Sequence, residues 1–242
     1  TDGAKASPYA QDAMKWAVAV GLIPGMGDNT LQPLRLSTRG QFATVIYRFF
    51  NSQVEINLMA TSDVHGQVYA TDYTADYSAS GTHYQGLTRV ATFVKQQREA
   101  YENTFLVDCG DLVQGTPLTY YYAFNQPEVD DPTMKTLRFM DYDMFVPGNH
   151  EFNYAPQIQW NYYNLLTSTD KAVAGQPVDV ICSNVVETET NESVFSPYKT
   201  FTYKFEDGTT FTIGLLGFEN MNNANWDVAS HYLSLIHISE PT

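Results

Sequence analysis

The sequence predicts an α/β fold, on two observations. Short apolar runs of strand length alternate with longer segments of helical periodicity, and a polar cluster begins within three residues of the end of three of the runs. Helical segments begin at Gly86, Pro132 and Pro156. Strands that alternate with helices are typical of a layered α/β domain. The strand-like runs are 56–61, 104–107, 143–146, 178–182 and 211–216.

The three polar clusters are the most informative feature of the chain. In an open α/β sheet, the loops at the carboxyl ends of the strands form the ligand crevice. We therefore expect the clusters to converge at one edge of the sheet, where carboxylate, imidazole and amide groups together suit divalent metal ions. One Asp-x-His occurs by chance in many loops, but three ordered clusters form a specific pattern. They are Asp63-Val64-His65, Gly110-Asp111 and Gly148-Asn149-His150-Glu151.

These clusters resemble the motifs of the calcineurin-like metallophosphoesterases, in the superfamily of 5′-nucleotidases and 2′,3′-cyclic-nucleotide phosphodiesterases. The resemblance covers residues 54–227. Segments 110–118 and 148–154 are most similar to the 2′,3′-cyclic-nucleotide 2′-phosphodiesterase/3′-nucleotidase branch. The family implies a layered α/β/β/α domain, and residues 51–232 would hold the N-terminal part of it.

The resemblance implies two divalent metal ions, drawn from Zn, Mn, Fe, Co and Mg. Asp63 and His65 would bind the first ion, and Asp111 would bridge both. Asn149 would bind the second ion through its amide oxygen. Paired ions of this kind activate water and neutralise charge on a phosphoryl group.

The resemblance also implies a catalytic role for His150, which would stabilise the phosphate or protonate the leaving oxygen. Asn153 would be its partner. The 5′-nucleotidase branch usually has Asp at that position, and an amide cannot stabilise an imidazolium electrostatically as a carboxylate does. We interpret Glu151 as a supporting carboxylate rather than a ligand.

Relatives take further ligands from downstream Gly-His motifs, and such motifs are missing here. The remaining histidines are His83, His231 and His237, and none stands in that context. Catalytic zinc usually has three protein ligands. We therefore expect about one metal ion per chain and activity near background.

The pattern of residues 1–50 predicts a separate helical unit. A first amphipathic helix precedes a Gly-rich turn, and Ser37 or Thr38 can cap a second helix. The pattern resembles an S-layer homology repeat, whose family binds cell-wall polysaccharide; a plain helical hairpin is the alternative. The predicted core of this unit is Trp16, Leu22, Ile46 and Phe49.

The composition excludes some partners. The formal net charge is −14, with only 13 Lys and Arg, which argues against a stable nucleic-acid polymer partner. No apolar stretch approaches the roughly 20 residues of a transmembrane helix. Cys109 and Cys182 are too few for a disulfide framework, and we expect both to be buried thiols. Residues 233–242 resemble a translated sequencing adaptor, so we expect them not to be native.

The sequence thus predicts a fragment of an extracellular, cell-wall or S-layer associated phosphoesterase that takes nucleotides or cyclic nucleotides. The first alternative is a 5′-nucleotidase or nucleotide-sugar hydrolase with the same metal chemistry, against which Asn153 and segment 114–117 argue. The second is a wall-binding surface protein with a degenerate phosphoesterase domain. The intact set of cluster residues argues against this second alternative.

Overall fold

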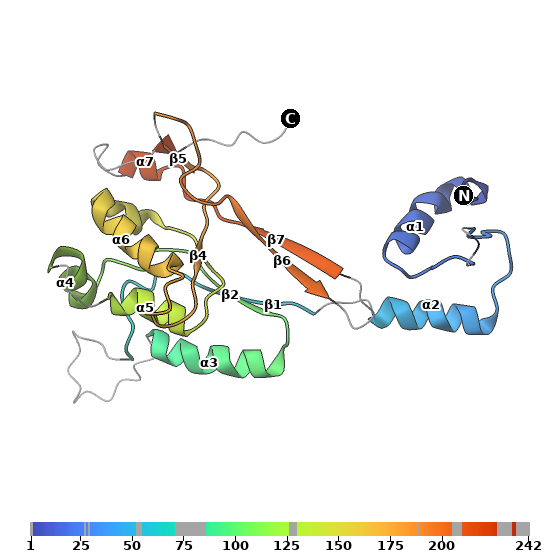
Figure 1. Cartoon of the computed structure of the whole chain (residues 1–242), viewed down its shortest axis with the longest axis horizontal. Coiled ribbons are helices and arrows are strands. Elements are labelled where there is room, and N and C mark those ends of the chain that lie inside the picture. Colours follow the sequence, from blue (N-terminus) through green and yellow to red (C-terminus); the bar gives the residue numbers. More distant parts are fainter. Residues whose placement is uncertain are drawn as a thin grey trace. The chain divides into compact units, whose positions relative to one another are not determined.

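The computed structural model (Figure 1) describes residues 2–26, 28, 30–51, 55–70, 86–125, 130–187, 189–204, 210–226 and 234–235. The chain forms two compact units. The first is Thr1–Glu55 with Lys204–Phe211, and the second contains the remaining residues. The sequence also predicts an exposed insertion at 67–84, which is rich in Tyr, Thr and Ser, and a hairpin turn at Asp207-Gly208. Most of the insertion and the whole turn lie outside the described residues.

A parallel four-stranded sheet forms the centre of the second unit. Its strand order is β1-β2-β3-β4, the same as the order in the sequence. The register pairs Thr61 with Asp108, and Asp108 with Phe145, so the carboxyl ends of the first three strands lie level. This sheet confirms the predicted α/β class. Its strands are β1 (Asn57–Thr61), β2 (Thr104–Asp108), β3 (Met144–Phe145) and β4 (Asp179–Val180).

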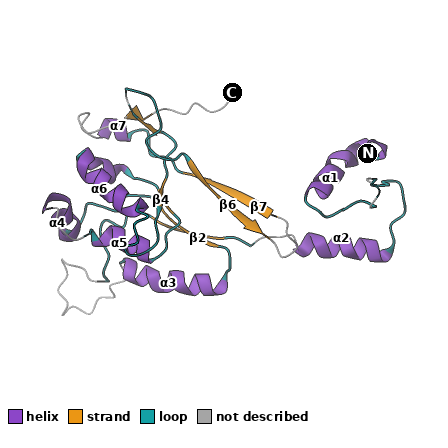
Figure 2. Cartoon of the chain, viewed as in Figure 1, coloured by secondary structure: helices purple, strands orange, loops and turns teal. Residues whose placement is uncertain are grey.

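Helices cover one face of this sheet. Figure 2 shows α3 (Leu87–Ala100), α5 (Pro132–Phe139) and α6 (Pro156–Thr167) beside the parallel strands. Side chains from these helices share one buried core with Leu106 and Phe145 of the sheet. All three helices were predicted from apolar periodicity. The helix α4 (Pro117–Asn125) was not predicted.

A β-hairpin covers the other face. It consists of β6 (Tyr198–Lys204) and β7 (Thr210–Leu216). The Phe105 ring lies 4.4 Å from the ring of Phe201 between centroids, and Leu215 packs on a second core that includes Val107. The second unit therefore has α/β/β layers. These layers agree with the incomplete α/β/β/α domain that the resemblance implies, and the described residues do not form its second helical layer.

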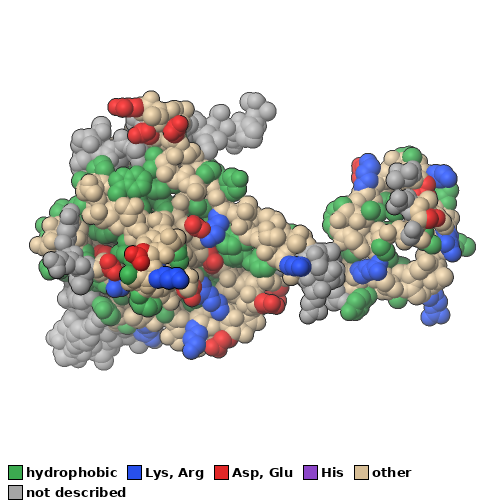
Figure 3. All heavy atoms as spheres, viewed as in Figure 1, with side chains coloured by type: hydrophobic (Ala, Val, Ile, Leu, Met, Phe, Trp, Pro, Cys, Tyr) green, Lys and Arg blue, Asp and Glu red, His purple; other side chains and the backbone are tan. Residues whose placement is uncertain are grey.

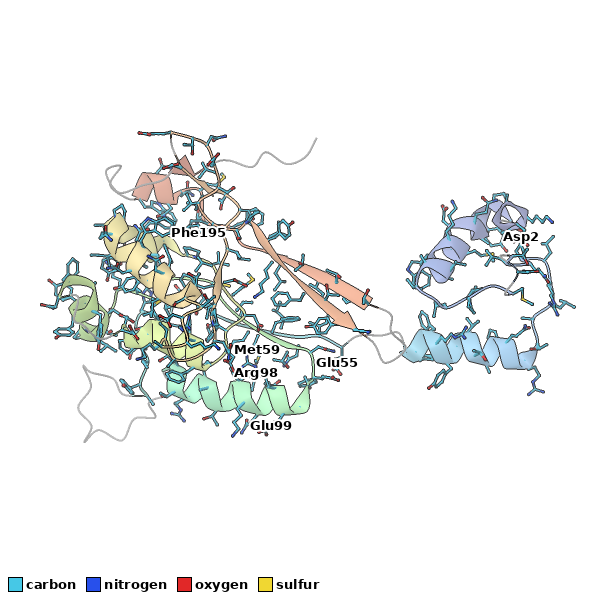
Figure 4. The ribbon with its side chains drawn as sticks, viewed as in Figure 1. Asp2, Glu55, Met59, Arg98, Glu99 and Phe195 are labelled. Atoms are coloured by element: carbon cyan, nitrogen blue, oxygen red, sulfur yellow. The ribbon has the colours of Figure 1, made fainter. Side chains whose placement is uncertain are left out.

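Two buried or half-buried arginines connect helices to loops. Arg138 of α5 is 1% exposed, and its guanidinium donates to backbone carbonyls at the end of α6 and in the following loop, including Leu166 (2.7 Å) and Ser168 (3.0 Å). Arg98, labelled on α3 in Figure 4, donates to the carbonyls of Met140 and Asp141. These contacts fix the ends of α5 and α6, which position the third polar cluster between them.

The N-terminal unit contains η1 (Gly3–Lys5), α1 (Pro8–Ala19) and α2 (Arg39–Asn51). Thr38 caps α2, since its hydroxyl accepts from the Gln41 amide (3.2 Å) while the Gln41 side chain accepts from the Thr38 amide (2.9 Å). This reciprocal pair is a capping box, with glutamine in place of glutamate. Asp2, labelled in Figure 4, accepts from two amides of the loop between the helices.

The predicted core of the N-terminal unit is wrong except for Leu22, which is 4% exposed. Trp16 is 54% exposed, Phe49 41% and Ile46 38%. The reason is size, because a unit of about fifty residues has too few elements to enclose both faces of two helices.

The remaining elements lie at the end of the chain. The two-residue strands β5 (Val185–Val186) and β8 (Ser234–Leu235) pair antiparallel, so part of the adaptor-like segment is placed beside β5. The short helix α7 spans Asn223–Trp226. Cys182 is buried as expected, but Cys109 is exposed because the chain leaves the sheet after Asp108. None of the described helices is long and apolar enough to cross a membrane.

Candidate metal centre

The loops after β1 and β2 run side by side beyond the ends of their strands. The Asp63 amide donates to the Gly110 carbonyl (3.0 Å), and the His65 amide donates to the Asp111 carbonyl (2.9 Å). Asp63, His65 and Asp111 all have φ between 50° and 54°. Left-handed φ is uncommon for non-glycine residues and is concentrated at functional sites. The first two clusters therefore meet through a shared backbone arrangement.

The third cluster contacts the second through two glycines. It forms η2 (Asn149–Asn153), which follows β3. A Cβ atom on Gly110 would lie 2.1 Å from the Gly148 nitrogen, and one on Gly148 would lie 2.5 Å from Asp111 Oδ1. Only glycine allows this approach, which lets the His150 amide donate to Asp111 Oδ1 (2.8 Å).

Glu151 fastens these two loops together. Its buried carboxylate accepts four backbone hydrogen bonds, two of them at 2.7 Å from Gly148 and 2.8 Å from Leu112. The other donors are the amides of Asp111 and Val113. Burial raises the pKa of Glu151 to about 7, while the four amides favour the ionised form. The geometry agrees with a supporting carboxylate, and sequence reasoning did not anticipate how many amides it serves.

His65, Asp111 and His150 form a group whose donor atoms all lie within 4.8 Å of one another. The two imidazole rings are 5.1 Å apart between centroids and meet edge to face. Asp63 Oδ1 lies 4.0 Å from His65 Nε2, beside this group but outside it. Asn149 precedes His150 at the start of η2. The structure thus brings the three clusters together, and it places His150 among the metal-binding candidates rather than apart from them.

Hydrogen bonds define which imidazole nitrogens face the site. His65 Nδ1 lies 2.8 Å from the Gln114 carbonyl oxygen, which can only accept. The Nδ1 atom of His65 therefore carries the proton and leaves Nε2 with a free lone pair. His150 Nδ1 makes a corresponding 2.7 Å contact with Asn153 Oδ1. Outer partners of this kind orient metal-binding histidines.

The donor set fits a divalent transition metal. Imidazole nitrogen and carboxylate oxygen are the ligands of zinc and of the neighbouring first-row ions. The pre-oriented rings, the left-handed backbone and the buried Glu151 hold these donors in place before any ion binds. His65, Asp111 and His150 are the residues that would hold it.

Asp108, the last residue of β2, is a buried carboxylate that sequence reasoning missed. It accepts from the Thr61 hydroxyl (2.6 Å) and from the Gly110 amide (3.0 Å). Tyr142 completes the network through a 2.9 Å contact with the Thr61 hydroxyl. Burial raises the pKa of Asp108 to about 7 from an ordinary value of 3.8. The available signal was a carboxylate at the end of an apolar run, two residues before the second cluster.

This raised pKa predicts a change in the pH dependence of stability. Between about pH 4 and pH 7, folded Asp108 keeps a proton that the unfolded chain loses, so the free energy of unfolding falls as pH rises. The slope from one group is at most about 1.4 kcal/mol per pH unit. Asp108→Asn should remove this contribution. Urea unfolding in EDTA at several pH values should therefore show a shallower decline for Asp108→Asn than for the unaltered chain.

Asp170→Asn is the control for this measurement, because Asp170 is an exposed carboxylate in a loop. Glu151 titrates in the same direction but is present in both proteins, so it cancels in the comparison. Parallel curves for Asp108→Asn and the unaltered chain would show that Asp108 ionises normally.

Histidines and carboxylates gathered at the carboxyl edge of an α/β sheet define a metal-dependent class of site. Residues 56–235 match the calcineurin-like phosphoesterase family, and residues 1–43 match the S-layer homology domain. The chain belongs to the calcineurin-like phosphoesterase family, which consists of metal-dependent phosphoesterases. These matches confirm the predicted enzyme class, and the S-layer homology match indicates a cell-surface association.

The chain is also similar to individual proteins, including one curated relative and one protein with a crystal structure. The chain is 33% identical over 195 residues to a 2′,3′-cyclic-nucleotide 2′-phosphodiesterase/3′-nucleotidase of Salmonella typhimurium, covering 78% of this chain and 28% of that protein. A crystal structure of the calcineurin-like phosphoesterase YfkN from Bacillus subtilis matches with a TM-score of 0.63 and 28% identity, covering 78% of this chain and 56% of that one. The chain thus spans little more than a quarter of the length of the Salmonella relative.

Proposed function

We infer that this protein is a metal-dependent hydrolase of nucleotide phosphate esters, acting first on 2′,3′-cyclic nucleotides. The convergence of His65, Asp111 and His150 within 4.8 Å is the observation that carries this inference. The similarity to the cyclic-nucleotide phosphodiesterases of Salmonella typhimurium and Haemophilus influenzae supports the substrate class.

Each residue contributes a defined part of the chemistry. Bound divalent ions would neutralise the phosphoryl oxygens and make water nucleophilic. His65 presents Nε2 to the site, and Asp63 adds a carboxylate oxygen 4.0 Å away. Asp111, whose Oδ1 accepts from the His150 amide, would hold both ions. Asn149, the first residue of η2, would supply a neutral amide oxygen to the second ion.

His150 has two proposed roles that one experiment separates. With Nδ1 held by Asn153, its Nε2 can protonate the leaving oxygen or bind an ion. His150→Ala should leave the number of bound ions unchanged if the residue acts only as the acid. A loss of bound ion together with activity would assign it as a ligand.

The substrate assignment is tested by ranking turnover of 2′,3′-cyclic AMP, 5′-AMP and a nucleotide sugar by the manganese- or zinc-loaded chain. We expect cyclic AMP to lead and His65→Ala to lie at background. Turnover should be slow, because the described residues form one group of metal-binding candidates, whereas the proposed chemistry uses two ions. Preference for 5′-AMP or the nucleotide sugar would favour the 5′-nucleotidase alternative. Full metal loading without turnover of any substrate would favour the degenerate surface protein.

The N-terminal unit is proposed to bind cell-wall polysaccharide and to hold the enzyme at the cell surface. We propose that residues 1–50 form the S-layer homology repeat and that residues 51–232 form the phosphoesterase part.

A nucleic-acid polymer is not favoured as a partner. On the face drawn in Figure 3, Lys and Arg side chains are scattered rather than gathered in a stripe.

Wall retention should depend on residues 1–50. The complete chain should sediment with purified cell walls, and a chain that starts at residue 51 should remain in the supernatant. Circular dichroism of both proteins controls for folding. Equal retention of the two would remove the anchoring role.

A further inference from the structure

The loop between Asp111 and α4 contacts His65 at two points. The His65 amide donates to the Asp111 carbonyl (2.9 Å), and the ring Nδ1 donates to the Gln114 carbonyl (2.8 Å). The first contact holds the backbone of His65, and the second holds the direction of its ring. The chain around the second polar cluster therefore decides how the first cluster presents its imidazole.

This loop is itself bonded on both sides. Glu151 Oε1 accepts from the amides of Leu112 (2.8 Å) and Val113 (3.1 Å). The Leu112 carbonyl accepts from the Gly66 amide (2.8 Å), next to His65. Leu112 and Val113 are fully buried. The Gln114 carbonyl thus follows directly on a segment whose backbone is already fixed.

Gln114 has two features that are unfavourable in isolation. Its φ is 69°, a left-handed conformation that costs energy in a non-glycine residue. Its Oε1 atom is buried and has no hydrogen-bond partner among the described residues. A buried acceptor of this kind also costs free energy. Such costs persist where the surrounding structure imposes them, which happens most often at functional sites.

Gly115 lets this loop lie directly against His65. Its φ is 132°, a conformation that favours glycine. A Cβ atom at position 115 would lie 2.8 Å from the Cβ atom of His65. The left-handed Gln114 and the glycine after it together bring the Gln114 carbonyl to the ring.

The second histidine of the group is held differently. His150 Nδ1 contacts the side-chain Oδ1 of Asn153 at 2.7 Å. A carboxamide has an oxygen that accepts and a nitrogen that donates, whereas a backbone carbonyl can only accept. Among these two histidines, only His65 therefore has its tautomer set by the backbone.

We propose that Gln114 is a positioning residue, whose left-handed backbone directs its carbonyl to His65 Nδ1 and so keeps Nε2 unprotonated and ready for a divalent ion. The role belongs to the backbone conformation at position 114 and not to the glutamine side chain. The proposal rests on the proposed function in one respect, because it takes His65 to be a metal ligand.

The first test measures the tautomer of His65 in the metal-free chain. Long-range proton–nitrogen NMR spectra in EDTA at pH 8 separate protonated from unprotonated ring nitrogens, and His65→Ala identifies the His65 signals. The unaltered chain should carry the proton on Nδ1. Gln114→Val should move it to Nε2 in part or entirely, because a β-branched residue does not tolerate this φ. Gln114→Gly should keep it on Nδ1, because glycine adopts the same φ without strain and retains the carbonyl.

The second test measures zinc affinity by isothermal titration. Gln114→Val should bind zinc about 10–100-fold more weakly, the usual loss when an outer partner of a metal ligand is removed. Gln114→Gly should bind as the unaltered chain does. Asn191→Val is the matched control, because Asn191 is exposed and has φ of 60°, so the same strain is introduced outside the site. The control should change neither the tautomer nor the affinity, and circular dichroism of each variant verifies folding.

Several results would overturn the positioning role. They are a His65 proton on Nε2 in the unaltered chain, loss of the Nδ1 proton in Gln114→Gly, and an equal tautomer or affinity in Gln114→Val and Asn191→Val. The His150 signals should be the same in all these variants, and a change there would show that the whole site has moved. The expected tautomers without zinc binding by any variant would support the contact to His65 and contradict the proposed function, so the two proposals fail separately.

Discussion

Asp111→Asn is expected to weaken binding of a divalent ion by more than about a hundredfold, since changes to the outer partners of metal ligands already cost about 10–100-fold. Asp111 is the only carboxylate in the group formed with His65 and His150 among the described residues. Asparagine tolerates left-handed φ, and its oxygen can still accept from the His150 amide. The substitution therefore removes charge and one carboxylate oxygen while leaving the loop in place.

Isothermal titration with zinc and with manganese measures this effect. Asp170→Asn is the matched control, because it makes the same chemical change at an exposed loop residue. The control should bind as the unaltered chain does. An affinity of Asp111→Asn within about threefold of the control, or about 0.7 kcal/mol, would show that Asp111 is not a ligand.

Glu151→Gln is expected to lower the free energy of unfolding by about 2–5 kcal/mol, because one oxygen is replaced by an amide group that cannot accept. Glu151 Oε2 accepts from Asp111 and Gly148, and Oε1 accepts from Leu112 and Val113. Whichever way the new amide points, two buried N–H groups lose their acceptor. Such a loss is large beside the roughly 5–15 kcal/mol that stabilises a typical domain.

Urea unfolding at pH 8, followed by circular dichroism, measures the change. Glu192→Gln is the control, since Glu192 is exposed and the same substitution there should cost under about 0.5 kcal/mol. Metal affinity should also fall in Glu151→Gln, because the loops that carry Asp111 and His150 are no longer fastened. A loss of stability no larger than the control's would mean that the four amides find other acceptors, and the supporting role of Glu151 would be wrong.

Local features of the sequence predicted the parts of the protein that depend on neighbouring residues. The apolar runs predicted β1, β2 and β3, and the polar residues directly after them predicted where the site would form. The sequence predicted that Ser37 or Thr38 caps a second helix, and Thr38 does so, because a helix cap involves only one turn of chain. The family resemblance rests on the same short clusters, and for this reason it could be recognised from the sequence.

Features that depend on contacts between distant segments could not be predicted from the sequence. The Tyr-rich segment of α4 has no clear apolar stripe, so its helix was not predicted. The exposure of Cys109 and of Trp16 depends on which elements pack beside them.

The chain by itself determined the strands, the order of the polar clusters and the residue types able to hold metal ions, because these follow from hydrophobic periodicity and side-chain chemistry. Only the tertiary structure decided that Glu151 accepts from amides up to 40 residues away, and that His150 joins His65 and Asp111. The physical reason is that hydrogen bonding and burial between distant segments depend on the three-dimensional approach of two loops. No local pattern in either loop records that approach.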